Sequence, residues 1–285
     1  MQELVNYLFE TRAIRVCPKG KPFWYTSGKI GPYYINTHFL FGSEEKANSF
    51  LEEIDSLKDN KTLCSKEFHR MVRENYMKDP VYKGTIDIMA EYLRQNIDVK
   101  AVDYVSGGER RDWFFSFMIA DLLDKPHITL FKDASSVIYH NGASYEKDDI
   151  EGASVLHVAD LITSASSYER AWVPAIEKIY GSMKWSLVVV DRLQGGRELL
   201  GKLNVESHAL VFVDEQVFRK AFEKGYIDAA QLDMVLKYME DPERFIDDFL
   251  GDHPGFISES LNDGGKTAER ARLLLKYLEE KNSIN

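Results

Sequence analysis

Hydroxyl and carboxylate side chains follow one apolar run of the sequence, in an order that suits a sugar phosphate. The run Ser154–Val158 is followed by Asp160 and then by a turn containing Thr163, Ser164, Ser166 and Ser167. A helix that begins in such a turn offers free backbone N–H groups and hydroxyl donors to a phosphate monoester. A carboxylate at the end of the strand can accept hydrogen bonds from ribose hydroxyls. The same hydroxyls could instead only cap the helix, so the segment alone favours neither interpretation.

Basic side chains follow three other apolar runs. They are Arg110 and Arg111 after Ala101–Val105, Lys132 after His127–Phe131, and Arg192 after Ser186–Val190. The two adjacent arginines come after a Gly-Gly turn, which favours a functional role over a solvated loop. Because a guanidinium is forked and always charged, these residues are suited to a phosphate or carboxylate ligand.

The elements that must position these side chains alternate between strand and helix. Five short apolar runs predict buried strands at Ala101–Val105, His127–Phe131, Ser154–Val158, Ser186–Val190 and Ala209–Val213. Helices are expected between them, notably at Trp113–Leu123 and Tyr168–Tyr180. This alternation predicts an α/β fold with a parallel sheet and right-handed crossovers. Ligands bind beyond the carboxyl ends of such strands, so the polar segments should meet at one edge of the sheet.

Helical patterns flank this core on both sides. Residues 43–99 show apolar residues at helical spacing, and residues 226–285 do the same, with a loop-like break around Gly251–Gly265. We therefore expect an N-terminal hood with a helical insertion over 1–99, an α/β core over 100–225 and a helical extension over 226–285.

Composition narrows the possible functions. The 285 residues include 36 Lys+Arg and 46 Asp+Glu, a formal net charge of −10. Residues 226–285 contribute −6 of this, which leaves −4 for residues 1–225. Because a broad basic field is missing, we expect neither a nucleic-acid polymer nor an anionic membrane as partner. We expect no signal peptide and no membrane span, because the first residues lack a basic leader followed by an apolar run and no run reaches ~18 apolar residues. We expect a cytoplasmic protein with two unpaired thiols, Cys17 and Cys64.

The positions of the histidines do not indicate a catalytic or metal-binding site. His157 lies inside a predicted strand and is expected to be packed. The histidines at 38, 69, 208 and 253 lack the spacing of metal ligands.

Three segments, in order, resemble motifs of orotate phosphoribosyltransferases, which belong to the type I phosphoribosyltransferases. Val155-Leu-His-Val-Ala-Asp-Leu-Ile-Thr-Ser-Ala-Ser-Ser167 resembles their motif for phosphoribosyl diphosphate (PRPP). Thr26-Ser-Gly-Lys-Ile-Gly-Pro-Tyr-Tyr-Ile-Asn36 resembles the N-terminal Lys-Ser-Gly-Arg-x-Ser-Pro-Tyr-Phe-Phe-Asn, and Asp191-Arg-Leu-Gln-Gly-Gly-Arg-Glu198 resembles Asp-Arg-x-(Glu/Gln)-x-Gly-Arg. The resemblance covers residues 23–215, interrupted by added helical sequence, and leaves out residues 226–285.

The resemblance implies a role for each matching residue. The segment of Thr163, Ser164, Ala165, Ser166 and Ser167 would cradle the 5′-phosphate of PRPP, and Asp160 would meet the ribose. Thr163 and Arg192 would hold orotate, with Tyr34 and Ile35 forming a wall of the base pocket. Mg²⁺ would be the cofactor, carried by PRPP, with Asp160 as the candidate protein ligand.

The same resemblance implies a loop for pyrophosphate and a mobile loop. Residues Ser106–Asp112 would form the first, with Arg110 and Arg111 as PRPP-binding groups, and Lys132 would join them at the site. The mobile loop would span about 133–149 and include His140, expected to act with Asp160 and Lys132 in catalysis. In the family this loop closes on the neighbouring subunit's site, which implies a homodimer.

Several positions depart from the family pattern. Ala159 replaces one of two acids, Ala165 replaces a glycine of the phosphate turn, Thr26 replaces a lysine, Phe131 replaces an arginine, and Ser135 or Ser136 stands where the loop lysine is expected. Each lost charge-assisted contact would cost ~1.5–3 kcal/mol of PRPP binding. Two alternatives therefore stay open: a homologue that binds nucleotides or PRPP without catalysis, and a phosphoribosyltransferase for another base.

Overall fold

The computed structural model describes residues 2–57 and 59–284, and these residues form two compact units. One unit combines residues 2–13 with residues 36–214, and the other combines residues 14–35 with the C-terminal residues from 215 onward. The second unit therefore joins a short N-terminal segment to a C-terminal one. Residues 14–35 and 215–225 therefore group with the C-terminal helices. The functional division expected at 1–99, 100–225 and 226–285 stays a prediction.

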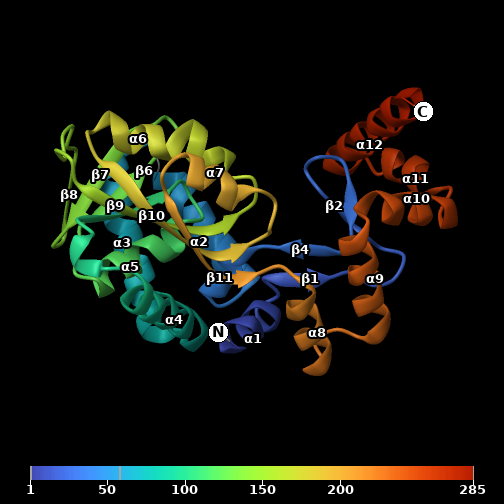
Figure 1. Ribbon diagram of the computed structural model, residues 1–285, viewed down its shortest axis with the longest axis horizontal. Coiled ribbons are helices and arrows are strands. Elements are labelled where there is room, and N and C mark those ends of the chain that lie inside the picture. Colours follow the sequence, from blue (N-terminus) through green and yellow to red (C-terminus); the bar gives the residue numbers. More distant parts are fainter. Residues whose placement is uncertain (1, 58, 285) are drawn as a thin grey trace. The chain divides into compact units, whose positions relative to one another are not determined.

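A seven-stranded sheet forms the centre of the first unit (Figure 1). The strand order is β11-β10-β9-β5-β6-β7-β8. The first five of these strands are parallel, whereas β7 and β8 are antiparallel additions at one edge. The strands are β5 (Tyr104–Gly108), β6 (His127–Leu130), β7 (Ser136–His140), β8 (Ala143–Tyr145), β9 (Ser154–Ile162), β10 (Ser182–Asp191) and β11 (Glu206–Phe212). The predicted α/β fold is confirmed.

The crossover helices lie on opposite faces of the sheet (Figure 1). Helix α5 (Trp113–Leu122) connects β5 to β6, so this connection proceeds toward one edge of the sheet. Helices α6 (Val173–Lys178) and α7 (Gly196–Lys202) connect β9 to β10 and β10 to β11, and these connections proceed toward the other edge. Because such crossovers are right-handed, reversing the direction moves the helices to the other face. The reversal occurs between β5 and β9, and the crevice at such a switch point is where parallel sheets bind ligands.

The predicted strands are all present, with shifted ends. The run Ala101–Val105 becomes a strand only from Tyr104, because Val99–Ala101 forms a short 3₁₀ turn, η2. That strand continues through Gly107 and Gly108, so the expected Gly-Gly turn is wrong. A Cβ at Gly108 would lie 2.3 Å from the Trp172 ring, so close packing explains this glycine. The predicted loop 133–149 is largely the hairpin of β7 and β8.

Helix α5 is apolar on every side because it is covered twice. It packs on β5, β6 and β9, and its outer face is covered by α3 (Lys61–Lys78) and α4 (Pro80–Asn96). The helices begin at local caps: the Asn60 side chain accepts the Leu63 N–H (3.1 Å), and Asp79 accepts the Val81 and Tyr82 N–H groups. Helix α2 (Glu44–Leu57) precedes them. The helical character predicted for 43–99 is confirmed.

Closely packed aromatic rings join the inserted helices to the core. The Phe50 ring of α2 lies 4.5 Å from Phe41, 4.3 Å from Phe68 of α3 and 4.8 Å from Phe114 of α5, measured between ring centroids. All four side chains are buried. The inserted helices are therefore part of the same hydrophobic core as the sheet.

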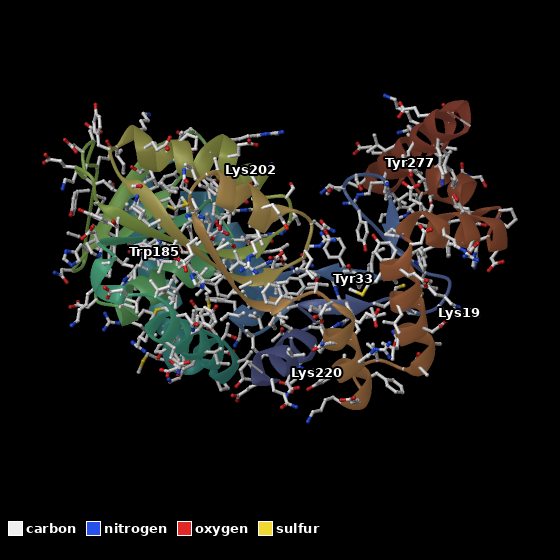
Figure 2. All side chains as sticks on the ribbon, in the orientation of Figure 1. Lys19, Tyr33, Trp185, Lys202, Lys220 and Tyr277 are labelled. Atoms are coloured by element: carbon white, nitrogen blue, oxygen red, sulfur yellow. The ribbon has the colours of Figure 1, made fainter. Side chains whose placement is uncertain are left out.

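The second unit is mainly helical. It contains short strands β1 (Ile14–Val16), β2 (Phe23–Trp24), β3 (Ile30–Gly31) and β4 (Tyr33–Ile35), and helices α8 (Glu215–Glu223), α9 (Ala229–Glu240), α10 (Pro242–Asp252), α11 (Phe256–Asn262) and α12 (Gly265–Ile284). The Tyr33 ring, labelled in Figure 2, packs against Phe218 and Tyr238. The Gln231 side chain donates to the Val16 carbonyl (3.1 Å), and Ile30, Ile246 and Leu274 form a buried cluster.

Two further elements complete the first unit, namely α1 (Gln2–Glu10) and the 3₁₀ helix η1 (Thr37–Phe41). Within residues 2–57 and 59–284, none of the helices is both long and apolar enough to cross a bilayer.

Removing one ring from the shared aromatic cluster should destabilise the first unit. Phe68 of α3 is buried and packs against Phe50 of α2 and Phe117 of α5. We therefore expect Phe68→Ala to lower the free energy of unfolding by about 3 kcal/mol or more. Met77, on the same helix, is 76% exposed, and Met77→Ala should change it by less than ~0.5 kcal/mol. Urea denaturation followed by circular dichroism measures both. Equal effects of the two variants would contradict a shared core.

Candidate functional site

A cavity of about 370 Å³ opens at the carboxyl ends of β5 and β9. Its walls are residues 109–112 after β5, Lys132 after β6, residues 159–163 and 165–168 at the end of β9, and Trp172. The structure therefore brings together most of the predicted PRPP-binding residues: Arg110, Arg111, Lys132, Asp160, Thr163, Ala165, Ser166 and Ser167. Ser164 is exposed and does not line the cavity.

Two buried carboxylates lie at the base of this cavity. Asp112 accepts the Gly108 N–H at Oδ2 (3.0 Å) and the Asp160 N–H at Oδ1 (3.1 Å). Burial, and then the nearby Asp112 charge, raise the pKa of Asp160 to about 7. No separate role was predicted for Asp112. Its position, as the acid directly before a predicted helix at a strand end, was the signal that could have identified it.

The turn after β9 has the backbone shape of a phosphate cradle. Ala165 adopts a left-handed conformation, with φ of 57°, and its carbonyl accepts the Tyr168 N–H (3.0 Å). This is the position where the family has glycine, and the conformation costs a non-glycine residue ~1–2 kcal/mol. Ser166 and Ser167 then start a helical turn, which leaves their N–H groups without intrahelical acceptors. The cradle shape is kept, while a methyl group is added to its wall.

That helical turn continues as η3 (Tyr168–Trp172), which has π-helical geometry and leads into α6. The predicted helix Tyr168–Tyr180 is thus present in two parts. The Tyr168 hydroxyl is 2.6 Å from Ser186 Oγ, which anchors the start of η3 on β10.

The basic residues of the site differ in how closely they contact acidic side chains. Arg110 Nη1 donates to the Leu51 carbonyl (3.2 Å) and to the Asp55 carboxylate, both on α2. Lys132 Nζ lies 3.9 Å from Glu109 Oε1, and its side chain is 70% exposed. The charge of Arg111 partly offsets the rise in the pKa of Asp160, and after burial it is the largest cause of the lowered pKa of His38. The cavity is therefore less cationic than its sequence suggests.

Two buried histidines border the site. His157 is fully buried, hydrogen-bonds Ser106 Oγ through Nδ1 (2.9 Å), and places Nε2 3.4 Å from Asp112 Oδ2, so the expectation that it is packed is confirmed. Burial, then the charges of Arg111 and Arg110, lower the pKa of His38 to about 3. His38 is consequently a neutral imidazole at ordinary pH.

The turn after β10 packs directly on the turn after β9. The Arg192 N–H donates to the Ile162 carbonyl (3.0 Å), and a Cβ at Gly196 would lie only 2.5 Å from the Thr163 carbonyl. Arg192 and Thr163, both predicted to hold orotate, are thus on adjoining turns. Tyr34 and Ile35 lie on β4 of the second unit, and their role as a wall of the base pocket stays a prediction.

His140 is not brought to this cavity. His140 is the last residue of β7. It lines a separate small cavity of about 60 Å³ together with Asp124, Lys125 and Asn141. Any catalytic role would require the hairpin to reach another subunit, and that role stays a prediction.

Two of the family departures have a structural explanation. Phe131 is 2% exposed and packs its ring 5.2 Å from Trp113, so this position belongs to the core and not to the cavity. Lys61 of α3 donates to Asp133 and to Ser135 Oγ (2.6 Å), and its charge lowers the pKa of Asp133. A lysine from the inserted helices therefore contacts the serine at the expected position of the loop lysine.

The described residues include no group of three or more His, Cys, Asp or Glu side chains arranged to hold a metal. Asp160 lines the cavity, but its raised pKa weakens it as a ligand for a hard cation. The residues fit a Mg²⁺ held chiefly by ligand phosphates, with Asp160 as an accessory carboxylate.

Comparisons with known proteins agree with this geometry. No family model matches the chain. A curated orotate phosphoribosyltransferase of Coxiella burnetii is 22% identical over 243 residues, which cover 85% of this chain and 97% of the relative. Among solved structures, orotate phosphoribosyltransferase from Aeropyrum pernix matches 78% of this chain and 99% of its own, with a TM-score of 0.51 and 19% identity. The fold is that of the type I phosphoribosyltransferases.

Other phosphoribosyltransferase structures give the same result. The orotate phosphoribosyltransferase of Francisella tularensis has a TM-score of 0.51 at 15% identity, and it covers 83% of this chain and 96% of its own. UMP synthase of Leishmania donovani has a TM-score of 0.54 at 19% identity over 84% of this chain. This chain spans only 41% of that larger protein. The resemblance to orotate phosphoribosyltransferases inferred from three motifs is therefore confirmed over most of the chain.

The raised pKa of Asp160 predicts a pH-dependent stability difference. An acid whose pKa is raised on folding stabilises the protein below its unfolded pKa, near 3.8, and this contribution is lost as pH rises through about 7. Asp160→Asn should therefore become more stable relative to the unmodified protein between pH 5 and pH 8, by ~2 kcal/mol. Urea titrations at the two pH values measure this change. A pH-independent difference would show that Asp160 is ionised throughout.

Proposed function

We propose that this protein is an orotate phosphoribosyltransferase that acts in the cytoplasm as a homodimer, with Mg²⁺ as cofactor. The observation that carries the proposal is the meeting, in one cavity at the switch point of the sheet, of a phosphate cradle, an acid at the strand end and a basic loop. In the reaction, the bond between C1 of PRPP and its pyrophosphate breaks, and a bond forms from C1 to a ring nitrogen of orotate. That nitrogen loses its proton, and the products are orotidine monophosphate and pyrophosphate.

Different cavity residues would bind different parts of PRPP. The N–H groups of Ser166 and Ser167, with the Thr163 hydroxyl, would bind the 5′-phosphate at the start of a helical turn. Asp160 would accept hydrogen bonds from the ribose hydroxyls. When bound, Mg²⁺ would neutralise part of the charge on the departing pyrophosphate.

The reaction separates charge, and the chain offers groups of the matching sign at each end. The ribose becomes cation-like in the transition state, and a carboxylate at position 160 stabilises it once ionised. The pyrophosphate becomes more negative, and Arg110, Arg111 and Lys132 lie on the wall where it would leave. The raised pKa of Asp160 means that a bound cation or polarised ribose must first favour its ionised form.

Orotate would be held beside the ribose by Thr163 and Arg192. A planar guanidinium can donate two parallel hydrogen bonds to the orotate carboxylate. The hairpin with His140 would close over the site of a partner subunit.

A second candidate function is binding of a nucleotide or PRPP without turnover. Two features of the cavity favour it. Ala159 stands in place of an acid that would face the ribose, and the pairing of Arg110 with Asp55 reduces the positive charge offered to pyrophosphate. Such a protein would keep the phosphate cradle and lose the chemistry.

Turnover separates the two candidates. Purified protein at high concentration, incubated with Mg²⁺, PRPP and orotate, should form orotidine monophosphate, detected by chromatography. Parallel incubations with uracil and adenine test the choice of base. Binding of orotidine monophosphate without any product formation would support the second candidate, and absence of both would reject the phosphoribosyltransferase assignment.

Arg192 provides a test of orotate recognition. Losing a charge-assisted contact costs ~1.5–3 kcal/mol, so we expect Arg192→Gln to raise the KM for orotate by ~10-fold or more. The KM for PRPP should stay within twofold. Lys202→Gln, in the exposed last turn of α7, is the control, since it also removes one positive charge, and it should change neither value. Equal kinetics of the two variants would remove Arg192 from the base pocket.

A further inference from the structure

The inserted helix α2 places a carboxylate on an arginine of the predicted pyrophosphate loop. Arg110 Nη1 is held by two acceptors one helical turn apart, the Leu51 carbonyl (3.2 Å) and the Asp55 carboxylate. The Arg110 side chain is 30% exposed and that of Asp55 is 49% exposed. The pair is therefore close enough to water for an incoming anion to compete for the guanidinium.

The two ends of the cavity consequently differ in charge. At the loop end, Arg110 is paired with Asp55, and Lys132 lies 3.9 Å from Glu109. At the cradle end, the phosphate would meet N–H groups and hydroxyls, and the nearest acid, Asp160, has a raised pKa. At the loop end, where a pyrophosphate would bind, an anion therefore has to compete with carboxylates that already contact the basic side chains.

We propose that Asp55 is a specificity-determining residue that lowers affinity for ligands carrying a diphosphate, while leaving affinity for nucleoside monophosphates unchanged. A nucleoside monophosphate uses only the cradle end, whereas PRPP and pyrophosphate must also engage the loop end. The identity of these ligands rests on the proposed function. The competition for Arg110 rests on the contacts of α2 alone.

The geometry favours competition over helpful orientation. Both acceptors on α2 bind the same terminal nitrogen, so that nitrogen is directed to the helix surface and not to a ligand. A diphosphate that engages Nη1 of Arg110 must displace the Asp55 carboxylate. One that uses the other guanidinium N–H groups still meets the negative charge of Asp55 on the same side chain, and that charge repels it. Removing that charge should strengthen diphosphate binding.

Asp55→Asn tests this, because it removes the charge and keeps the shape of the side chain. By isothermal titration calorimetry at low salt, we expect sodium pyrophosphate to bind at least tenfold more tightly to this variant than to the unmodified protein. Orotidine monophosphate affinity should stay within twofold. Glu52→Gln is the matched control: Glu52 is exposed on the same helix and loses the same charge, and neither affinity should change more than twofold.

A double variant identifies the arginine involved. Adding Arg110→Gln to Asp55→Asn should abolish the gain in pyrophosphate affinity. If Asp55→Asn binds pyrophosphate no more tightly than Glu52→Gln does, or if no variant binds pyrophosphate, the proposal is overturned. Asp55→Ser, checked by circular dichroism, repeats the test should the asparagine variant fail to fold. Loss of orotidine monophosphate binding in every variant would reject the proposed function and leave the pyrophosphate comparison intact.

Discussion

The carboxylate of Asp112 holds together the ends of two parallel strands that no longer pair. Strands β5 and β9 share a register only from Tyr104 to Ser106, and beyond it they separate. The two N–H groups left at the separation, those of Gly108 and Asp160, both donate to Asp112. One side chain thus satisfies two buried amides and fixes the width of the crevice. The positions of the turn at Thr163–Ser167 and of the basic residues Arg110 and Arg111 both depend on it.

The inserted helices act on this crevice as well as on the core. The aromatic cluster around Phe50 ties them to α5, and the same helices contribute Asp55 to Arg110 and Lys61 to the turn after β6. Packing and charge are therefore coupled: helices that stabilise the unit also set the electrostatics of its site. Residues outside the motif-like segments therefore contribute to the charge distribution around the cavity.

Local patterns predicted the features that are local in cause. Runs of β-branched residues indicated the strands, and the hydroxyl-rich segment indicated the turn at Thr163–Ser167, because each depends on neighbours a few residues apart. The hairpin of β7 and β8 was not predicted, because the family resemblance implied a mobile loop over the same residues. Contacts such as Asp55 with Arg110, or Val16 with Gln231, join residues far apart in sequence, and no periodicity encodes them. The same limit applies to the second unit, whose two segments lie at opposite ends of the chain.

The left-handed alanine at position 165 shows how the shape of its turn is determined. Its backbone keeps φ of 57° although glycine is absent, so the surrounding contacts impose that shape and the residue tolerates it. Glycine at this position would relieve the strain without changing the turn, because glycine adopts a positive φ freely. The surroundings of the turn therefore set its backbone, and the side chain at position 165 only has to fit it.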